Sequence, residues 1–320
     1  MNILEKVYLF FYGLKKKKAI KNQKKLPFPV ISIGNLTVGG TGKTPFTVAL
    51  AKELEKKGYR PIILTRGYRG RLKRPVIVKE YMNAEDVGDE PLMMVMEGLT
   101  VVKAIERYAG GVYAIEKLSL TDKDRVIFIL DDGFQHWQLQ RNLNILLIDG
   151  YRGFGNQRLL PLGSLRSPLE EIIEADMVFI TKQENESLKG EIQEKGVKNL
   201  FFSPLSIKGI FSFEGEKITP VGQKVYAFAG IGNFEGFLNS LKSLKLEVVG
   251  YKKFIDHKIY SEKLLRKINS LASEAQLVIT TKKDFVKIGK HPSLTDKFCF
   301  LDISLELDSS AMQEIVRKIS

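Results

Sequence analysis

The sequence predicts an α/β protein whose first part is a parallel sheet covered by helices, followed by a second, smaller α/β unit. Three observations support this fold class. A glycine-rich loop follows a short apolar run at residues 29–34. Apolar runs of strand length then alternate with helical stretches, which is typical of a parallel sheet. The same alternation begins again after about residue 220.

The N-terminal segment, residues 1–25, combines an apolar, aromatic block with eight lysines and one acidic residue. The block is shorter than the roughly 20 apolar residues that a membrane-spanning helix needs. The lysines follow the block, whereas a secretory signal has its charge first. The segment therefore predicts a membrane-associating anchor, with aromatic rings in the headgroup region and lysines on anionic lipid. A helix packed on the domain with solvated lysines is the alternative, and both can hold together.

The loop at residues 37–44 has the sequence TVGGTGKT and follows the expected strand Val30–Ile33. Its glycines lack a Cβ, so the backbone can curl and direct N–H groups at phosphate oxygens, beside the positive end of the next helix. Lys43 offers a charge for the β- and γ-phosphates, and Thr44 a hydroxyl for Mg²⁺. The strict P-loop (Walker A) pattern has glycine where this chain has Thr37. The residues expected to bind ATP are Thr37, Val38, Gly39, Gly40, Thr41, Gly42, Lys43 and Thr44.

Further strands of the first unit are expected at Pro61–Thr65, Pro75–Val78, Val126–Leu130, Asn144–Ile148 and Met177–Ile180. The run at 126–130 ends in Asp131 and Asp132. Ligands bind at the carboxyl ends of strands in open α/β sheets, and a carboxylate there can lie near Mg²⁺. Asp149 ends the run at 144–148 and is a competing candidate.

A second acidic pair, Asp89 and Glu90, stands where a helix is expected to begin. Carboxylates are favoured there by the helix dipole, and proline is common in the first turn. A kinase also needs a carboxylate that orients or deprotonates the acceptor hydroxyl. By itself such a pair is more often a helix cap.

The second unit is expected to contain strands at Lys224–Ala229, Leu246–Tyr251 and Leu277–Thr280. Runs at 201–213 and 300–307 flank it and can pair as a two-stranded connector, and the helix at 309–319 can return to the first unit. The predicted boundaries are a kinase domain at 26–204, a linker at 205–213 and 300–307, a smaller domain at 214–299 and a final helix at 308–320.

Composition excludes some classes of function. The single cysteine, Cys299, allows no intrachain disulfide and indicates a reducing compartment, and no Cys/His cluster suggests zinc. The net charge of +13 would allow nucleic-acid binding, but no recognition motif accompanies it. A membrane-associated regulatory ATPase of the partitioning type remains the alternative function. Such proteins have a lysine just before the Gly-Gly pair, where this chain has Val38.

Several motifs together resemble one family, the tetraacyldisaccharide 4′-kinases, or lipid A 4′-kinases. The matching segments, in chain order, are 34–45 (GNLTVGGTGKTP), 66–68 (RGY), 88–91 (GDEP), 131–136 (DDGFQH), 153–156 (GFGN), 159–166 (LLPLGSLR), 230–233 (GIGN), 256–257 (DH) and 281–284 (TKKD). They span nearly the whole chain, and Thr37 is itself typical of the family.

The resemblance implies transfer of the γ-phosphate of ATP to the 4′-hydroxyl of a lipid A disaccharide 1-phosphate. It implies a peripheral or monotopic monomer on the cytoplasmic face of the bacterial inner membrane, without nucleic acid. The implied catalytic residues are Asp89, His257, Lys43 and Asp132, with Asp89 as the base and His257 orienting it. The implied metal ligands are Thr44, Glu90, Asp131 and Asp132. The implied substrate contacts are Asn35, Arg66, Tyr68 and Arg166.

Overall fold

A continuous mixed sheet runs through the protein in the order β11-β10-β12-β13-β8-β7-β6-β1-β5-β2-β4-β3, with β9 beside β8. It is seen in a computed structural model, which describes residues 2–289 and 296–319. The sequence has three histidines, His136, His257 and His291, and His291 lies outside the described residues. The strands are β1 (Val30–Gly34), β2 (Arg60–Thr65), β3 (Val76–Ile77), β4 (Thr100–Lys103), β5 (Val126–Asp131), β6 (Leu143–Asp149), β7 (Met177–Lys182), β8 (Leu200–Ser212), β9 (Lys217–Ile218), β10 (Lys224–Ala229), β11 (Glu247–Lys253), β12 (Leu277–Thr281) and β13 (Phe298–Leu305). The helices are α1 (Ile3–Lys21), α2 (Lys43–Lys56), α3 (Ala84–Val87), α4 (Asp89–Met96), α5 (Arg107–Lys117), α6 (Glu186–Glu194), α7 (Phe234–Ser243), α8 (Glu262–Leu271), α9 (Lys282–Ile288) and α10 (Ser309–Ile319), with 3-10 turns η1 (Asp122–Asp124) and η2 (Leu169–Glu174).

The larger unit is built on the parallel strands β7, β6, β1, β5, β2 and β4, with the short β3 antiparallel at the edge. Alternate residues of a strand point to opposite faces of the sheet, so each central strand contributes side chains to two hydrophobic cores, one on each face. Ile127 and Ile129 of β5 pack with α2, α4 and α10, whereas Phe128 and Leu130 pack on the side of α5. Every residue of β1 and β5 is buried, which explains their continuous apolar runs.

The expected strands of this unit are all present, but β4 was missed by the sequence analysis. Its sequence, TVVK, is only four residues long and ends in a lysine. Lys103 is nevertheless buried and donates hydrogen bonds to the carbonyl oxygens of Gly70 and Leu72. A lysine in so short a run indicates an exposed segment, so the sequence pattern did not predict this strand. β4 lies between β2 and β3 in the sheet.

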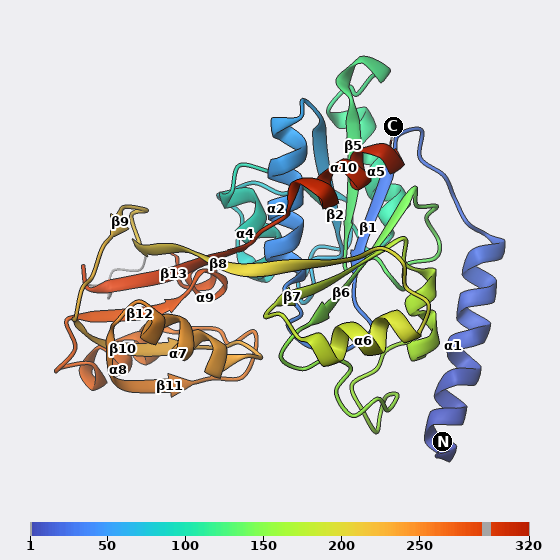
Figure 1. Cartoon of the computed structure of the whole chain (residues 1–320). Coiled ribbons are helices and arrows are strands. Elements are labelled where there is room, and N and C mark those ends of the chain that lie inside the picture. The colour runs from blue at the N-terminus through green and yellow to red at the C-terminus, as the bar shows by residue number, and fades with distance from the viewer. Residues whose placement is uncertain (1, 290–295, 320) are drawn as a thin grey trace.

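Two long strands connect the units, as Figure 1 shows. β8 pairs in parallel with β7 through residues 200–204 and then antiparallel with β13 through residues 205–212. The predicted pairing is therefore present, and it extends the sheet from one unit into the other. After β13 the chain returns to the larger unit, where Met312 and Ile315 of α10 enter the core beneath α2.

The smaller unit repeats the layered arrangement. Its parallel strands β11, β10, β12 and β13 have α8 and α9 on one face and α7 on the other. Cys299 is buried in β13 as a small apolar residue.

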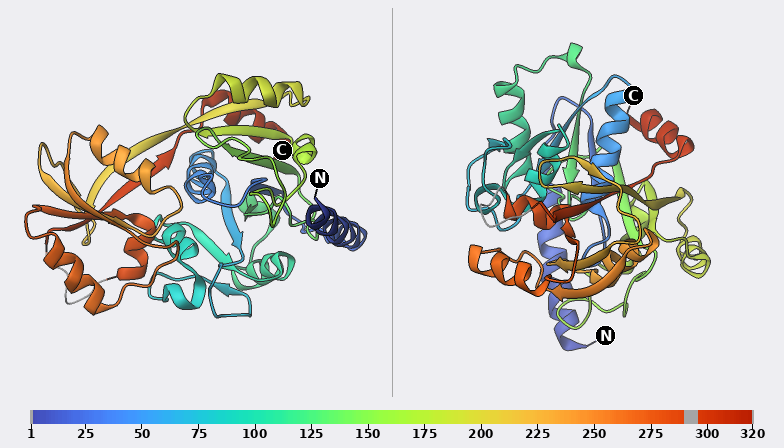
Figure 2. Two further views of the ribbon diagram at one scale, coloured as in Figure 1. Left: turned by 90° about the horizontal axis from the view of Figure 1, so that it is seen from below. Right: turned by 90° about the vertical axis from the view of Figure 1, so that its left-hand side faces the viewer.

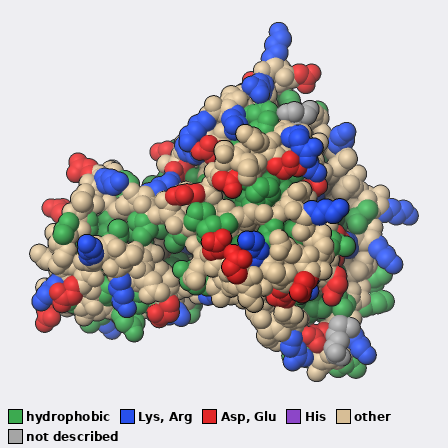
Figure 3. All heavy atoms as spheres, in the orientation of Figure 1, with side chains coloured by type: hydrophobic (Ala, Val, Ile, Leu, Met, Phe, Trp, Pro, Cys, Tyr) green, Lys and Arg blue, Asp and Glu red, His purple; other side chains and the backbone are tan. Residues whose placement is uncertain are grey.

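Helix α1 lies along the outside of the larger unit, at the end of the molecule opposite the smaller unit (Figures 1 and 2). One side of it is packed: the Tyr8 hydroxyl donates to the carbonyl oxygen of Arg166 at 2.7 Å, and the Tyr12 ring stacks edge-on against Trp137. The other side exposes large apolar residues, including Phe10 and Phe11, each 63% exposed. In the space-filling view, hydrophobic and basic side chains lie together over this helix (Figure 3). In the described ranges, no helix is long and apolar enough to cross a membrane.

Candidate active site

The glycine-rich loop joins β1 to α2 at the carboxyl edge of the sheet. Gly42 is the N-cap of α2 with φ of 86°, a left-handed conformation that glycine adopts without strain. A Cβ at this position would lie 2.9 Å from the Leu305 side chain, so β13 of the connector passes directly over the loop. The Val38 N–H donates to the carbonyl oxygen of Ser164 at 2.7 Å, and Thr37 bridges to Leu165. The 159–166 motif therefore forms the outer wall of the loop.

Lys43 is the first residue of α2. Its Nζ lies 3.1 Å from Oδ1 of Asn35 and 3.6 Å from Oδ1 of Asp132. Asn35 is fully buried and also accepts a hydrogen bond from the Arg166 guanidinium. In this arrangement Asn35 contacts both Lys43 and Arg166, while its Nδ2 is buried without a partner among the described residues. The expected contact of Asn35 with the substrate stays a prediction.

Asp132 and Arg166 form a two-pronged ion pair, with Nη1 to Oδ2 at 2.9 Å and Nη2 to Oδ1 at 2.7 Å. Desolvation would raise the pKa of Asp132, but the charges of Lys43 and Arg166 hold that pKa well below its usual range. The backbone of Asp132 has φ of 53°, in the left-handed region that few residues other than glycine adopt. Such strained positions concentrate at functional sites.

Asp131 ends β5 and is only 2% exposed. Its carboxylate accepts long hydrogen bonds from Thr65 at 3.3 Å and Thr47 at 3.5 Å. Burial, and then the nearby charges of Glu90 and Asp132, raise its pKa to about 7. Like charges brought together at a strand end favour binding of a cation. Among the residues that the structure describes, however, no three His, Cys, Asp or Glu side chains are already grouped as metal ligands.

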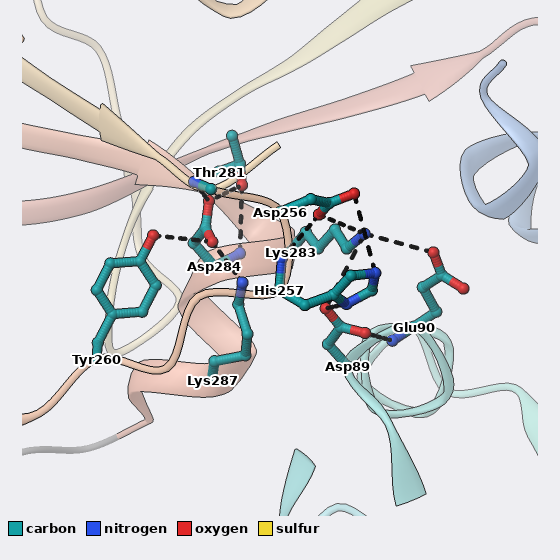
Figure 4. A network of polar contacts seen from close by, with 10 residues as sticks. Asp89, Glu90, Asp256, His257, Tyr260, Thr281, Lys283, Asp284 and Lys287 are labelled. Carbon is teal, nitrogen blue, oxygen red and sulfur yellow. Dashed lines mark hydrogen bonds and ion pairs between the residues drawn. The ribbon is translucent and has the colours of Figure 1, made fainter. Parts of the chain in front are cut away.

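The two units meet at Asp89 and His257, which are 168 positions apart (Figure 4). Nδ1 of His257 lies 2.9 Å from Oδ2 of Asp89, which is 5% exposed at the start of α4. Burial would raise the pKa of Asp89, but the hydrogen bond from His257 and the charge of Lys283 outweigh it and lower that pKa. An ionised carboxylate only accepts hydrogen bonds, so Nδ1 of His257 is the donor.

His257 is itself held in a strained conformation, with φ of 61°. Its backbone N–H donates to Oδ1 of Asp256 at 2.9 Å, which fixes the turn. The exposed Tyr68 ring lies 5.3 Å from the His257 ring. Before Tyr68, Gly67 has φ of 64°, and a Cβ there would lie 2.3 Å from the Val87 carbonyl oxygen. This close approach explains the Arg66-Gly67-Tyr68 motif, because the loop lies against the backbone that precedes Asp89.

A groove of about 1280 Å³ opens beside this pair. Asp89 and His257 lie on its wall, together with apolar residues of both units such as Leu92 and Phe285. The groove therefore offers a ligand access to the surface beside Asp89 and His257.

Asp149, the competing acidic candidate, is already neutralised. Its Oδ2 lies 2.5 Å from Nζ of Lys182, and its Oδ1 accepts the backbone N–H groups of Tyr151 and Arg152. Lys182 also donates to the carbonyl oxygen of Gly40 in the glycine-rich loop. Asp149 thus positions Lys182, which in turn holds the backbone of the glycine-rich loop.

Two residues at the site were missed by the sequence analysis. Arg107 is buried at the first position of α5, and its positive charge acts to lower the pKa of both Asp131 and Asp132. A cation at a helix N-terminus opposes the helix dipole, and this was a usable signal. Arg152 donates from Nη2 to the carbonyl oxygen of Gly232 at 2.9 Å, and its Nη1 lies beside Gly39. It therefore connects the glycine-rich loop to the 230–233 motif of the smaller unit.

Comparisons with known proteins identify the family of the chain. A family model described as tetraacyldisaccharide-1-P 4′-kinase matches residues 1–320. The tetraacyldisaccharide 4′-kinase of Desulfotalea psychrophila is 39% identical over 289 residues, covering 85% of this chain and 82% of its own. That of Aquifex aeolicus is 39% identical over 293 residues, covering 89% and 87%.

A solved structure extends the similarity to three dimensions. The crystal structure of LpxK from Aquifex aeolicus, described as an apo form in complex with ATP, superposes with a TM-score of 0.74 at 33% identity. The match covers 99% of this chain and 100% of the other.

Proposed function

The chain belongs to the tetraacyldisaccharide 4′-kinase family, and on this premise we propose how its residues transfer a phosphoryl group. Its activity is that of a tetraacyldisaccharide 4′-kinase, a step of lipid A biosynthesis. The partitioning-type ATPase, the alternative from the sequence, has no support in these relatives. ATP is the proposed donor, since the related solved structure binds it, and the 4′-hydroxyl of tetraacyldisaccharide 1-phosphate is the acceptor.

The glycine-rich loop is the proposed site of the ATP phosphates. Backbone N–H groups of residues 37–44 and the positive end of α2 would bind the phosphate oxygens. Lys43 would exchange its contacts with Asn35 and Asp132 for the β- and γ-phosphates. Asn35 and Asp132 then keep the ammonium aimed at the loop when the nucleotide is absent.

The contact between Asp89 and His257 is the observation on which the mechanism mainly rests. Asp89 would accept the proton of the acceptor hydroxyl as the new phosphorus–oxygen bond forms. His257 holds the carboxylate in place through its 2.9 Å hydrogen bond. Because the two residues come from different units, the base is complete only when the units are together.

The acidic residues at the end of β5 fit a divalent cation. Thr44, Asp131 and Glu90 would hold Mg²⁺, since a hydroxyl and carboxylates are the hard oxygen ligands that Mg²⁺ prefers. Burial, and then the nearby carboxylates of Glu90 and Asp132, raise the pKa of Asp131, and a cation would relieve that repulsion. When bound, Mg²⁺ neutralises charge on the β- and γ-phosphates. Asp132 is the remaining candidate, and here it pairs with Arg166.

Arg66, Tyr68 and Arg166 are the proposed acceptor contacts. Arg66 and Tyr68 are exposed on the loop beside Asp89, and a guanidinium matches the geometry of a phosphate. Helix α1 would bring the enzyme to its lipid substrate by resting its exposed apolar side on the cytoplasmic face of the inner membrane, as a peripheral or monotopic protein.

The test is an assay with ATP, Mg²⁺ and tetraacyldisaccharide 1-phosphate that detects the bis-phosphorylated product. Lys43→Ala should lower turnover by about 10²-fold or more, because a positioned charge on the phosphates is lost. Lys56→Ala, at the exposed end of the same helix, is the matched control and should retain turnover. Near wild-type turnover in Lys43→Ala would show that the loop is not the site of transfer.

A further inference from the structure

One lysine beside the proposed base has no role in the mechanism above. Lys283 is in the first turn of α9, in the smaller unit. Its Nζ lies 3.2 Å from Oδ1 of Asp256, 3.5 Å from Oε1 of Glu90 and 4.0 Å from Oδ2 of Asp89 (Figure 4). The ammonium therefore comes from one unit, and two of its three partners come from the other.

We propose that Lys283 is a catalytic residue that binds the transferring phosphoryl group when both substrates are in place. The inference rests on the proposed function of Asp89 as the base. It adds a second lysine to the phosphate site, which the smaller unit supplies to the loop of the larger unit.

Distances around the base place Lys283 near the reaction. A carboxylate that takes a hydroxyl proton lies about 2.6–3.2 Å from the hydroxyl oxygen. That oxygen approaches phosphorus to about 3–3.5 Å before the bond forms. The acceptor hydroxyl and Lys283 thus share one carboxylate, that of Asp89. A phosphoryl group in line with the hydroxyl comes within reach of an ammonium on a flexible four-carbon stem.

The chemistry of the step needs such a charge. The acceptor oxygen forms a bond to the γ-phosphorus, the bond from that phosphorus to the bridging oxygen breaks, and ADP leaves with the electron pair while Asp89 takes the proton. Negative charge lies on the phosphoryl oxygens throughout and develops on the bridging oxygen. A cation already positioned there stabilises the transition state without reorganisation.

The charge balance around Lys283 supports the same role. Asp89, Glu90 and Asp256 surround the ammonium, so the cluster without Lys283 would carry three negative charges towards an incoming triphosphate. The Lys283 ammonium lies within 4.0 Å of all three carboxylates and offsets part of their charge.

The backbone beneath Lys283 is fixed by its neighbour Asp284, which is fully buried. Asp284 accepts hydrogen bonds from the Gly230 N–H at 2.9 Å, the Tyr260 hydroxyl at 3.0 Å and the Thr281 hydroxyl at 2.9 Å, and it pairs with Lys287 at 2.6 Å (Figure 4). The 230–233 and 281–284 motifs are thus joined through one carboxylate. The Lys283 side chain projects from this fixed backbone at the place where the units meet.

The neighbouring residue supplies a matched control. Lys282 is on the same turn and also bridges the units, through Glu97, and it lies 2.9 Å from Asp302. No interaction connects it to Asp89 in the described structure. Lys282→Met therefore removes a contact between units and leaves the charge beside the base.

The experiment compares Lys283→Met, Lys283→Arg and Lys282→Met in the full-length enzyme, with melting temperatures to verify folding. Lys283→Met should lower kcat by about 10²–10³-fold with little change in the KM for ATP, as expected for an interaction made in the transition state. Lys283→Arg should recover part of the loss, and Lys282→Met should stay within about threefold of wild type. ADP with aluminium fluoride and the lipid acceptor should form a trapped complex with wild type and Lys282→Met, but not with Lys283→Met.

Three outcomes would overturn the inference: wild-type kcat in Lys283→Met, equal losses in both methionine variants, or trapping that survives Lys283→Met. Asp89→Asn separates the inference from its premise. An inactive Asp89→Asn with an active Lys283→Met overturns the role of the lysine alone, whereas an active Asp89→Asn overturns the base and the lysine together.

Discussion

Asp89 has the surroundings that a proton acceptor needs. It is buried, it lies at the N-terminal end of α4, and two cationic or hydrogen-bonding side chains of the smaller unit keep it ionised. His257 is held by Asp256 in a strained backbone conformation, so its ring is directed by the local turn and by Asp89 together. The two residues should therefore act as one unit.

Asp89→Ala and His257→Ala should each lower kcat by roughly 10²–10⁴-fold, the range of general acid–base catalysis, with a small change in the KM for ATP. The double variant should lose much less than the product of the single losses, since either change removes the same function. Glu85→Ala, which removes an exposed acid of the preceding helix α3, is the control and should retain turnover. Fully multiplicative losses would refute the pairing.

At the scale of elements, α1 divides its residues between two tasks. Tyr12 and Lys16 bind Glu171, and Tyr8 binds the backbone of Arg166, so the packed side supports the segment that carries Arg166, a proposed acceptor contact. On the exposed side Phe10 and Phe11 lie edge-on to each other, and among the described residues no other aromatic ring contacts them. Deleting the whole of α1 would therefore disturb both the packing against the larger unit and the proposed membrane contact. Substitutions on the exposed side alone test the membrane contact without changing the packing.

Phe10→Asp combined with Phe11→Asp should lower binding to anionic phospholipid vesicles by about tenfold or more, because two exposed rings can no longer enter the headgroup region. Co-sedimentation measures the binding, and kcat on detergent-dispersed substrate should be retained. Tyr81→Asp, an 83% exposed aromatic elsewhere on the surface, is the control and should bind vesicles like wild type. Unchanged binding of the double variant would place the membrane contact on another surface.

At the scale of the whole molecule, the larger unit is completed by the last helix of the chain. The chain leaves it through β8, builds the smaller unit and returns through β13 to α10. Ile315 of α10 is fully buried in the core that also contains residues of β1, β5 and β6. The smaller unit is therefore an insertion between two parts of one core.

Ile315→Ala should lower the free energy of unfolding of the larger unit by about 2–4 kcal/mol, the cost of a cavity in a packed core. The chain has one tryptophan, Trp137, and it lies in the larger unit, so its fluorescence during urea unfolding reports this unit specifically. Gln313→Ala, on the exposed side of the same helix, should change the free energy of unfolding by less than about 0.5 kcal/mol. An unchanged tryptophan transition in Ile315→Ala would mean that α10 is no part of this core.

The sequence alone determined features that depend on local chemistry. The glycine-rich loop, the strands other than β4 and β9, the helix start at Asp89 and the connector follow from glycine placement, apolar runs and cap residues, which act over a few neighbouring positions. The motifs also predicted the family, which is confirmed, and a contact between Asp89 and His257, which is present at 2.9 Å. The catalytic role of that contact stays a prediction.

The tertiary structure decided what depends on distant segments. Strand β4 was missed because a lysine normally indicates an exposed position. The buried ammonium of Lys103 is instead stabilised by hydrogen bonds to carbonyl oxygens of a distant loop, which no local pattern reveals. Asn35 proved to be a buried partner of Lys43, and Lys283 was brought beside Asp89, because contacts between units are set by packing and not by spacing along the chain. The electrostatic potential at a site is the sum over charges from several elements, and each contribution depends on distance. The amino-acid composition determines which charges are present, whereas the fold determines how far apart they lie.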